Sequence, residues 1–197
     1  MAVKDTTIIP GQGWVFYSEV DTAPFDLKGF DSADPTKNIA GWTWLGSTSK
    51  ENLTQIEKDG GDVSVLDTWD TPAMRSNKAE TNWTVTVNSV SITPEMLQLA
   101  FPGGKLSKGT YHVPAKETSA EKALLLVIKD AVQGYVGIYF PKGALSIGSA
   151  PSLNADSFME VPLVMTALTS GKTGNRMDWI LPESLAGGAG VAPGIGG

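Results

Sequence analysis

Two stretches decide the fold class of this chain: Gly41-Trp42-Thr43-Trp44-Leu45-Gly46 and Thr81-Asn82-Trp83-Thr84-Val85-Thr86-Val87-Asn88. In the second stretch, large apolar residues (Trp83, Val85 and Val87) alternate with small polar ones (Asn82, Thr84, Thr86 and Asn88). Alternation with a period of two is typical of a β-strand with one buried face. We therefore expect a strand at each end of the region 41–88, the two pairing as a hairpin, with the apolar set of the second strand facing a core.

The segment between these two strands, residues 50–80, is longer than most connections inside a compact domain. It contains Asp59-Gly60-Gly61-Asp62, which predicts a tight hairpin turn, and a short strand-like run, Val63 to Leu66. A tryptophan, a methionine and a proline farther along argue against low-complexity disorder. We expect an arm that leaves the domain and packs on a neighbouring molecule.

Length and composition limit the class of protein. The 197 residues, 41% of them apolar, suit a single domain with extensions and a core. The chain has no cysteine, which excludes disulfides, thiolate zinc sites and thiol nucleophiles. The first residues lack the apolar segment of a signal peptide, and the longest aliphatic run, Ala123 to Ile128, is far shorter than a membrane span. We expect no membrane association.

The charge balance bears on nucleic acid. The formal net charge is −6, and an acidic chain does not hold DNA through neutralisation of its phosphates. Such a chain can still surround nucleic acid without binding it.

The rest of the chain predicts mostly strands. We expect one short helix, with Thr93 as N-cap, Pro94 at the first helical position and Pro102-Gly103-Gly104 after its end. Strands are predicted at residues 14–20, 122–129, 134–140 and 158–168, with a weak strand at residues 111–113 and a turn at residues 141–143. The run at 122–129 is apolar on both faces, which predicts a central strand. The predicted fold is mainly β, a β-sandwich or open barrel with one short flanking α-helix, a long inter-strand arm and extended termini. Residues 1–13 would form an N-terminal arm, 14–169 the β domain, and 170–197 a C-terminal arm ending in a glycine-rich tail.

Motifs with possible chemistry are weak. Gly171-Lys172-Thr173 lacks both the preceding glycine of a phosphate loop and a following helix, so a surface turn is favoured. The single histidine, His112, has no serine nucleophile motif elsewhere and favours a structural role. Asp59, Asp62, Asp67 and Asp70 lack the spacing of a calcium loop. We predict no catalytic residue, no metal site and no cofactor.

Four tryptophans lie in or beside the region 41–88. Core packing is the default for Trp42, Trp44 and Trp83, because they lie in predicted strands. Trp69 lies in the arm, where an intermolecular anchor is favoured because tryptophan is enriched at interface hot spots.

Several stretches, taken in order, resemble the major tail tube protein of long-tailed bacteriophages, especially those of actinobacterial hosts. They are Gly61-Asp62-Val63-Ser64-Val65-Leu66-Asp67-Thr68-Trp69-Asp70-Thr71-Pro72-Ala73-Met74-Arg75, the strand at 83–87, Gly137-Ile138-Tyr139-Phe140-Pro141-Lys142-Gly143 and Ser157-Phe158-Met159-Glu160-Val161-Pro162-Leu163. The resemblance covers roughly residues 41–168.

The resemblance implies a non-enzymatic structural protein of the virion tail, assembled in the cytoplasm of the host bacterium. It implies six-membered rings that stack into a tube through which the viral DNA passes without specific binding. Tape-measure, tail terminator and distal tail or baseplate proteins would be partners. The long loop, residues 59–80, would reach the adjacent ring, with contacts from Asp59, Asp62, Asp67, Trp69, Pro72, Met74 and Arg75. We further expect the small polar face of Asn82, Thr84, Thr86 and Asn88 to line the lumen, because a neutral or acidic lumen does not retain DNA.

Two other classes of function remain open. The main alternative is a monomeric β-sandwich module that binds carbohydrate or a receptor through exposed tryptophans, and an enzyme is the third. Particle size separates the first two, because a tube protein forms rings or filaments whereas a binding module stays small.

Overall fold

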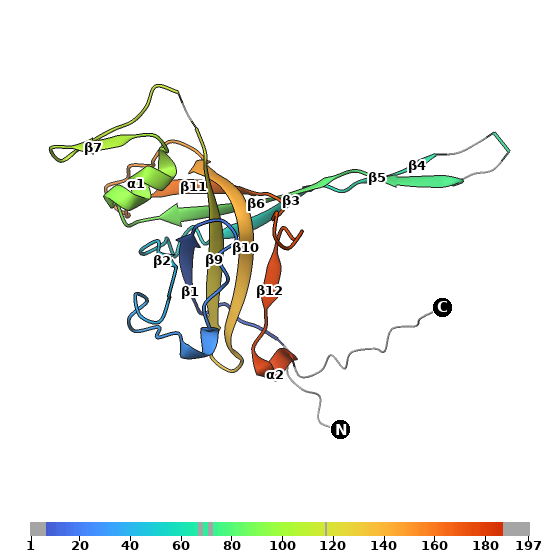
Figure 1. Ribbon diagram of the computed structural model, residues 1–197, viewed down its shortest axis with the longest axis horizontal. Coiled ribbons are helices and arrows are strands. Elements are labelled where there is room, and N and C mark those ends of the chain that lie inside the picture. Colours follow the sequence, from blue (N-terminus) through green and yellow to red (C-terminus); the bar gives the residue numbers. More distant parts are fainter. Residues whose placement is uncertain (1–6, 67–68, 71–72, 117, 187–197) are drawn as a thin grey trace.

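The computed structural model describes residues 7–66, 69–70, 73–116 and 118–186, and their regular secondary structure is mainly β-strand (Figure 1). The strands are β1 (Gln12–Ser18), β2 (Thr43–Trp44), β3 (Gln55–Gly60), β4 (Val63–Leu66), β5 (Arg75–Lys78), β6 (Thr81–Ser89), β7 (Lys105–Ser107), β8 (Thr110–His112), β9 (Ala120–Asp130), β10 (Gly134–Ile147), β11 (Val161–Ala167) and β12 (Asp178–Ile180). The helices are a 3-10 turn, η1 (Leu27–Gly29), and two α-helices, α1 (Pro94–Ala100) and α2 (Glu183–Ala186).

Eight strands form one antiparallel sheet in the order β2-β1-β9-β10-β11-β6-β3, with β12 also pairing with β10. β10 is the branch point. Along one edge it pairs with β9, and along the other its residues 137–139 pair with β12 and its residues 143–147 pair with β11. The sequence expectation of a hairpin between residues 41–46 and 81–88 is therefore wrong, because β2 pairs with β1 whereas β6 lies between β11 and β3.

The turn predicted at residues 141–143 is also wrong. β10 continues through this segment as a strand of 14 residues, and only the register with β9 shifts, between Phe140 and Gly143. A β-bulge absorbs extra residues without ending a strand. Gly143 fits there because a Cβ atom at this position would collide with the side chain of Met165 on β11.

The main core lies on one face of the sheet. Its buried members come from β1, β6, β9, β10 and β11, and from α1, so the two halves of the curled sheet enclose one apolar cluster. The largest fully buried side chains in this cluster include Phe140, Met96, Leu163 and Met165. This arrangement confirms a mainly β fold of the sandwich type.

A second apolar cluster lies on the other face of β1, β9 and β10, and the sequence patterns missed it. The long segment between β1 and β2 buries Phe25, Leu27, Phe30 and other apolar residues against this face. Its rings meet edge to face, as for Phe16 and Phe25 with centroids 5.1 Å apart. Since β9 is covered on both faces, its run of apolar residues is explained.

The helix α1 matches its prediction. Thr93 is the N-cap, and its hydroxyl oxygen accepts a hydrogen bond from the Met96 backbone N–H at 3.2 Å. Pro94 occupies the start of the helix and Glu95 its first turn, where a negative charge is favourable. The helix buries Met96, Leu99 and Ala100 in the main core.

Segments near both ends of the chain are attached to the sheet. Before β1, the backbone N–H of Ile9 donates to the Asp130 carboxylate at 2.7 Å. Near the other end, β12 pairs with β10, and the guanidinium of Arg176 donates to the Thr81 carbonyl at the start of β6. The predicted surface turn at Gly171-Lys172-Thr173 is confirmed, and all three residues are exposed.

Candidate assembly surfaces

The most exposed feature of the molecule is a long β-hairpin arm that continues the β3–β6 pair outward (Figure 1). The register is the same on both sides of the junction: Gly60 pairs with Thr81 in the sheet, and Val63 pairs with Lys78 on the arm. Asp59-Gly60-Gly61-Asp62 is therefore not a hairpin turn, and that prediction is wrong. We use "the arm" from here on for residues 61–80.

Two glycines mark the point where the arm leaves the sheet. Gly60 and Gly61 have φ angles of 75° and 81°, in the left-handed region that other residues adopt at a cost. A Cβ atom on Gly60 would also collide with the carbonyl oxygen of Glu80, and one on Gly61 would lie 2.7 Å from Thr81 Oγ1. The glycines thus interrupt the strand geometry while the pairing continues past them.

The arm exposes apolar side chains along its described length. The exposed fractions are 60% for Val63, 52% for Val65, 58% for Leu66, 64% for Met74 and 106% for Trp69. Isolated two-stranded hairpins are marginally stable in water, and exposed apolar patches mark interaction surfaces. Of the predicted inter-ring contacts, Asp62, Trp69, Met74 and Arg75 lie exposed on the arm, whereas Asp67 and Pro72 lie outside the described residues.

Asp59 lies in the sheet rather than on the arm. It pairs with Asn82 at the outer end of β3, and its carboxylate accepts the backbone N–H of Gly60 at 2.9 Å. Because paired residues share a face of the sheet, Asp59 belongs with the polar side chains of β6.

The polar face of β6 is the second candidate surface. Val85, Val87 and Ser89 are buried, while Asn82 is exposed and Thr84, Thr86 and Asn88 are half-buried, so the predicted alternation of the strand is confirmed. We call the outward side of β3, β6, β11 and β10 "the polar face". Its members by register are Gln55, Glu57, Asp59, Asn82, Thr84, Thr86, Asn88, Pro162, Val164, Thr166, Ala144 and Ser146.

The charges on the polar face are mostly acidic. Glu57 and Asp59 lie on β3, and no lysine or arginine is among the members named above. Lys142, at the margin on β10, is paired with Glu121 of β9 at 3.0 Å. A surface of this kind offers no group that would neutralise DNA phosphates.

The tryptophans divide into packed and exposed sets. Trp42 is buried in the second cluster, and Trp44 and Trp83 are half-buried against the two clusters, as predicted for strand residues. Among the described residues the strongly exposed tryptophans are Trp69 on the arm and Trp179 on β12, which is 57% exposed. These two elements are separate in the fold (Figure 1), so the two indoles do not form one binding platform.

A small hairpin that the sequence analysis only half recognised projects from the body beside α1 (Figure 1). Residues 111–113 were predicted as a weak strand, but its partner β7 was missed. The sequence signal that could have predicted this hairpin is the Lys108-Gly109 pair between two short runs. In the structure both residues have positive φ angles (49° and 79°), as the central residues of a two-residue hairpin turn require. His112 lies exposed on β8.

Two further findings concern the residues that the structure describes. No group of three histidine, aspartate or glutamate side chains is close enough there to hold a metal ion. Within the same residues, no helix has the length and apolar character needed to cross a membrane.

Comparison with known proteins defines the class. The family model described as phage tail tube protein matches residues 1–190, and the chain belongs to that family. It is similar to the major tail protein Gp23 of Mycobacterium phage D29 and to the major tail protein Gp23 of Mycobacterium phage L5. Each is 28% identical over 176 residues, which covers 85% of this chain and 88% of the relative. The protein is a structural subunit of a phage tail tube and a component of the virion tail, and major tail tube proteins self-assemble into that tube.

Proposed function

We propose that this subunit forms six-membered rings that stack into the tail tube, with the arm of each subunit contacting the adjacent ring. The observation that carries the proposal is the arm itself. Its described valine, leucine, methionine and tryptophan side chains are more than half exposed in the single subunit. Burying such side chains contributes about 25 cal/mol for each Å² of apolar surface. A second copy of the chain is the partner that a self-assembling subunit always has available.

We also propose that the polar face lines the lumen and lets viral DNA pass without binding it. Supporting this are the small uncharged side chains of β6, the two carboxylates of β3 and the pairing of Lys142 with Glu121. A positively charged lumen would hold DNA through counterion release. As a tail tube subunit, the protein would contact tape-measure, terminator and distal tail proteins at the ends and interior of the tube, and it would act without catalysis.

The role of the arm is tested by removing it. Residues 61–80 are replaced by Asn-Gly, a two-residue turn that closes the existing pair between Gly60 and Thr81. Because none of the described residues of the arm belongs to either apolar cluster, we expect the thermal midpoint of the monomer to stay close to that of the wild type. Negative-stain microscopy and sedimentation should show tubes with six-fold rings for the wild type and no tubes for the shortened protein. Tubes from the shortened protein would show that the arm is dispensable.

The proposal that the polar face lines the lumen is tested by adding positive charge to that face. Changing Thr84 and Thr86 to lysine should cost only about 0.5 kcal/mol in folding, because surface substitutions are well tolerated. Repeated around every ring, the lysines should slow or stop genome ejection, more strongly at low salt. The control adds two lysines at Ala155 and Ser157, which are exposed in the β10–β11 loop. Normal ejection by the Thr84/Thr86 variant at low salt would place the polar face outside the lumen.

A further inference from the structure

A pocket lies between the end of α1, the segment that joins β8 to β9 and the end of β10, and nothing above assigns it a role. We propose that this pocket receives the apolar arm of a second copy of the chain, so that copies join head to tail. The proposal rests on the proposed function and adds the receiving site to it.

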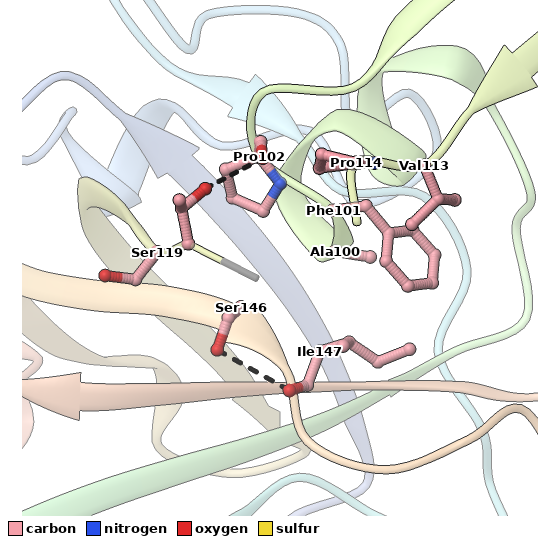
Figure 2. A pocket seen from close by; sticks show the side chains of 9 residues that line it. Ala100, Phe101, Pro102, Val113, Pro114, Ser119, Ser146 and Ile147 are labelled. Carbon is pink, nitrogen blue, oxygen red and sulfur yellow. Dashed lines mark hydrogen bonds between the residues drawn. The ribbon is translucent and has the colours of Figure 1, made fainter. Parts of the chain in front are cut away.

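The pocket is small and is lined by six apolar and three hydroxyl-bearing residues, none of them charged (Figure 2). Its volume is about 330 Å³. Phe101 and Pro102 come from the end of α1, Val113 and Pro114 follow β8, and Ile147 ends β10. A flat indole ring can pack against the two proline rings and the phenylalanine edge, since aromatic groups favour such contacts.

The walls of the pocket are held in place before any partner arrives. The Tyr111 hydroxyl donates to the Phe101 carbonyl oxygen at 2.9 Å, and the Thr118 hydroxyl donates to the Pro102 carbonyl oxygen at 2.8 Å. The Tyr111 ring lies against Gly104, where a Cβ atom would come within 2.5 Å of the ring. Because the site is preformed, docking costs little ordering of the receiving side.

The arm and the pocket have complementary charges. The arm, residues 61–80, includes four acidic and two basic residues, a net charge of −2. Residues 100–119, which run from the end of α1 through the hairpin β7–β8 to the last lining residue before β9, include three lysines and one glutamate, a net charge of +2. These lysines, Lys105, Lys108 and Lys116, are exposed. Complementary charge at the rim of an interface speeds association and selects its orientation.

The two surfaces also lie at opposite ends of the molecule. β6 runs from the base of the arm to the segment before α1, so the arm projects from one end of the strand and α1 lies beyond the other (Figure 1). The end of α1 lines the pocket. A contact between two different surfaces of the same chain is heterologous, and repeating it without closure produces an open filament. A tube that grows ring upon ring needs a contact of this kind.

A second apolar hollow competes for the arm and is disfavoured. It has a volume of about 450 Å³ and is lined by residues that include Leu53, Ile56 and Leu126, at the opening between β1 and β3. Residues 48–58 around it carry two lysines and two glutamates, so this rim is neutral and offers the acidic arm no attraction.

The first experiment is a cross-link, which the absence of native cysteine makes unambiguous. Met74→Cys on the arm is combined with Val113→Cys at the pocket, and in a parallel protein with Leu53→Cys at the competing hollow. All three positions are exposed, so the subunit should fold normally. Mild oxidation of assembled tubes should give a ladder of disulfide-linked subunits on a non-reducing gel for the Met74/Val113 pair only. A ladder for Met74/Leu53, or none for Met74/Val113 in intact tubes, overturns the proposal.

The second experiment works even if a cysteine variant fails to assemble. Val113→Asp should raise the concentration needed for polymerisation at least about tenfold, equivalent to 1.4 kcal/mol, by placing a like charge in the path of the arm. Val132→Asp, at an exposed valine in the β9–β10 turn, is the matched control and should polymerise like the wild type. Equal effects of the two substitutions, or none for Val113→Asp, would overturn the pocket assignment. Failure of the wild type itself to polymerise would instead overturn the proposed function, and the pocket assignment with it.

Discussion

Two strands of this molecule, β9 and β4, are both rich in valine and leucine, but the apolar side chains of β9 are buried whereas those of β4 are exposed. In β9, Ala123 to Val127 are all buried, between β1 and β10 and under apolar cover on both faces. In β4, Val63, Val65 and Leu66 are more than half exposed, and β5 is the strand that pairs with it. Valine and leucine in a strand thus predict burial, but they do not say whether the covering surface belongs to the same molecule.

The difference has an energetic consequence. Apolar burial is the main favourable term in folding, so β9 contributes to the stability of the subunit itself. The arm leaves its apolar surface in water until a partner covers it. We therefore expect substitutions in β9 to change the free energy of unfolding, and substitutions in the arm to change assembly.

The largest expected effect comes from a matched pair of leucines. Leu125→Ala removes a side chain that is fully buried in the second cluster and should reduce the free energy of unfolding by about 2–5 kcal/mol. Leu66→Ala, at 58% exposure on the arm, should change it by less than about 0.5 kcal/mol. Urea denaturation of the unassembled subunit measures both. Similar losses for the two variants would mean that the arm is part of the subunit core.

A smaller, pH-dependent effect is expected at the turn of the β9–β10 hairpin. The Asp130 carboxylate accepts backbone N–H bonds from Gln133, Ile9 and Val132, and these lower its pKa below the ordinary value. A depressed folded-state pKa means that the stabilisation is complete above the ordinary carboxyl pKa of about 4 and is lost as the pH falls through the folded value.

Asp130→Asn should therefore destabilise the subunit at pH 7, and the gap to the wild type should shrink as the pH falls below about 4. Thermal midpoints measured from pH 7 down to pH 2.5 follow this gap. A gap that stays constant over that range would show that the charge of Asp130 is unimportant.

The smallest effect on the stability of the subunit is expected at Gly60, where the sheet continues into the exposed arm. Gly60→Ala forces a residue with a Cβ atom into the left-handed region, at a cost of about 1–3 kcal/mol, and against the Glu80 carbonyl. The arm can relieve most of this strain by fraying, so the unfolding midpoint of the body should change little while tube formation falls. Gly134→Ala, also at positive φ but with open space around it, controls for glycine replacement on the β9–β10 hairpin, away from both the arm and the pocket. Tubes of normal yield from Gly60→Ala would show that the direction of the arm is unimportant.

Much of the fold could be predicted from short stretches of the sequence. The cap at Thr93, the alternation of Trp83 to Val87 and the two-sided apolar run of β9 each arise from neighbouring residues, and all three are confirmed. The predictions were wrong where the structure of a segment depends on the distant strand with which it pairs. Asp59-Gly60-Gly61-Asp62 has the composition of a turn, yet residues on both sides of it pair in one register with a distant segment. Proline and glycine at residues 141–143 suggested a turn, but β9 and β11 hold the chain in a strand there.

The sequence by itself determined that this chain is a mainly β tail tube subunit with an apolar arm, because alternation, capping and ordered motifs are properties of adjacent residues. Only the tertiary structure decided which strands are neighbours, that Phe25, Leu27 and Phe30 close a second core, and that the arm and the pocket beside α1 lie at opposite ends. The physical reason is that strand pairing and packing join residues far apart in the chain, and the periodicity of a strand does not specify which distant strand will pair with it.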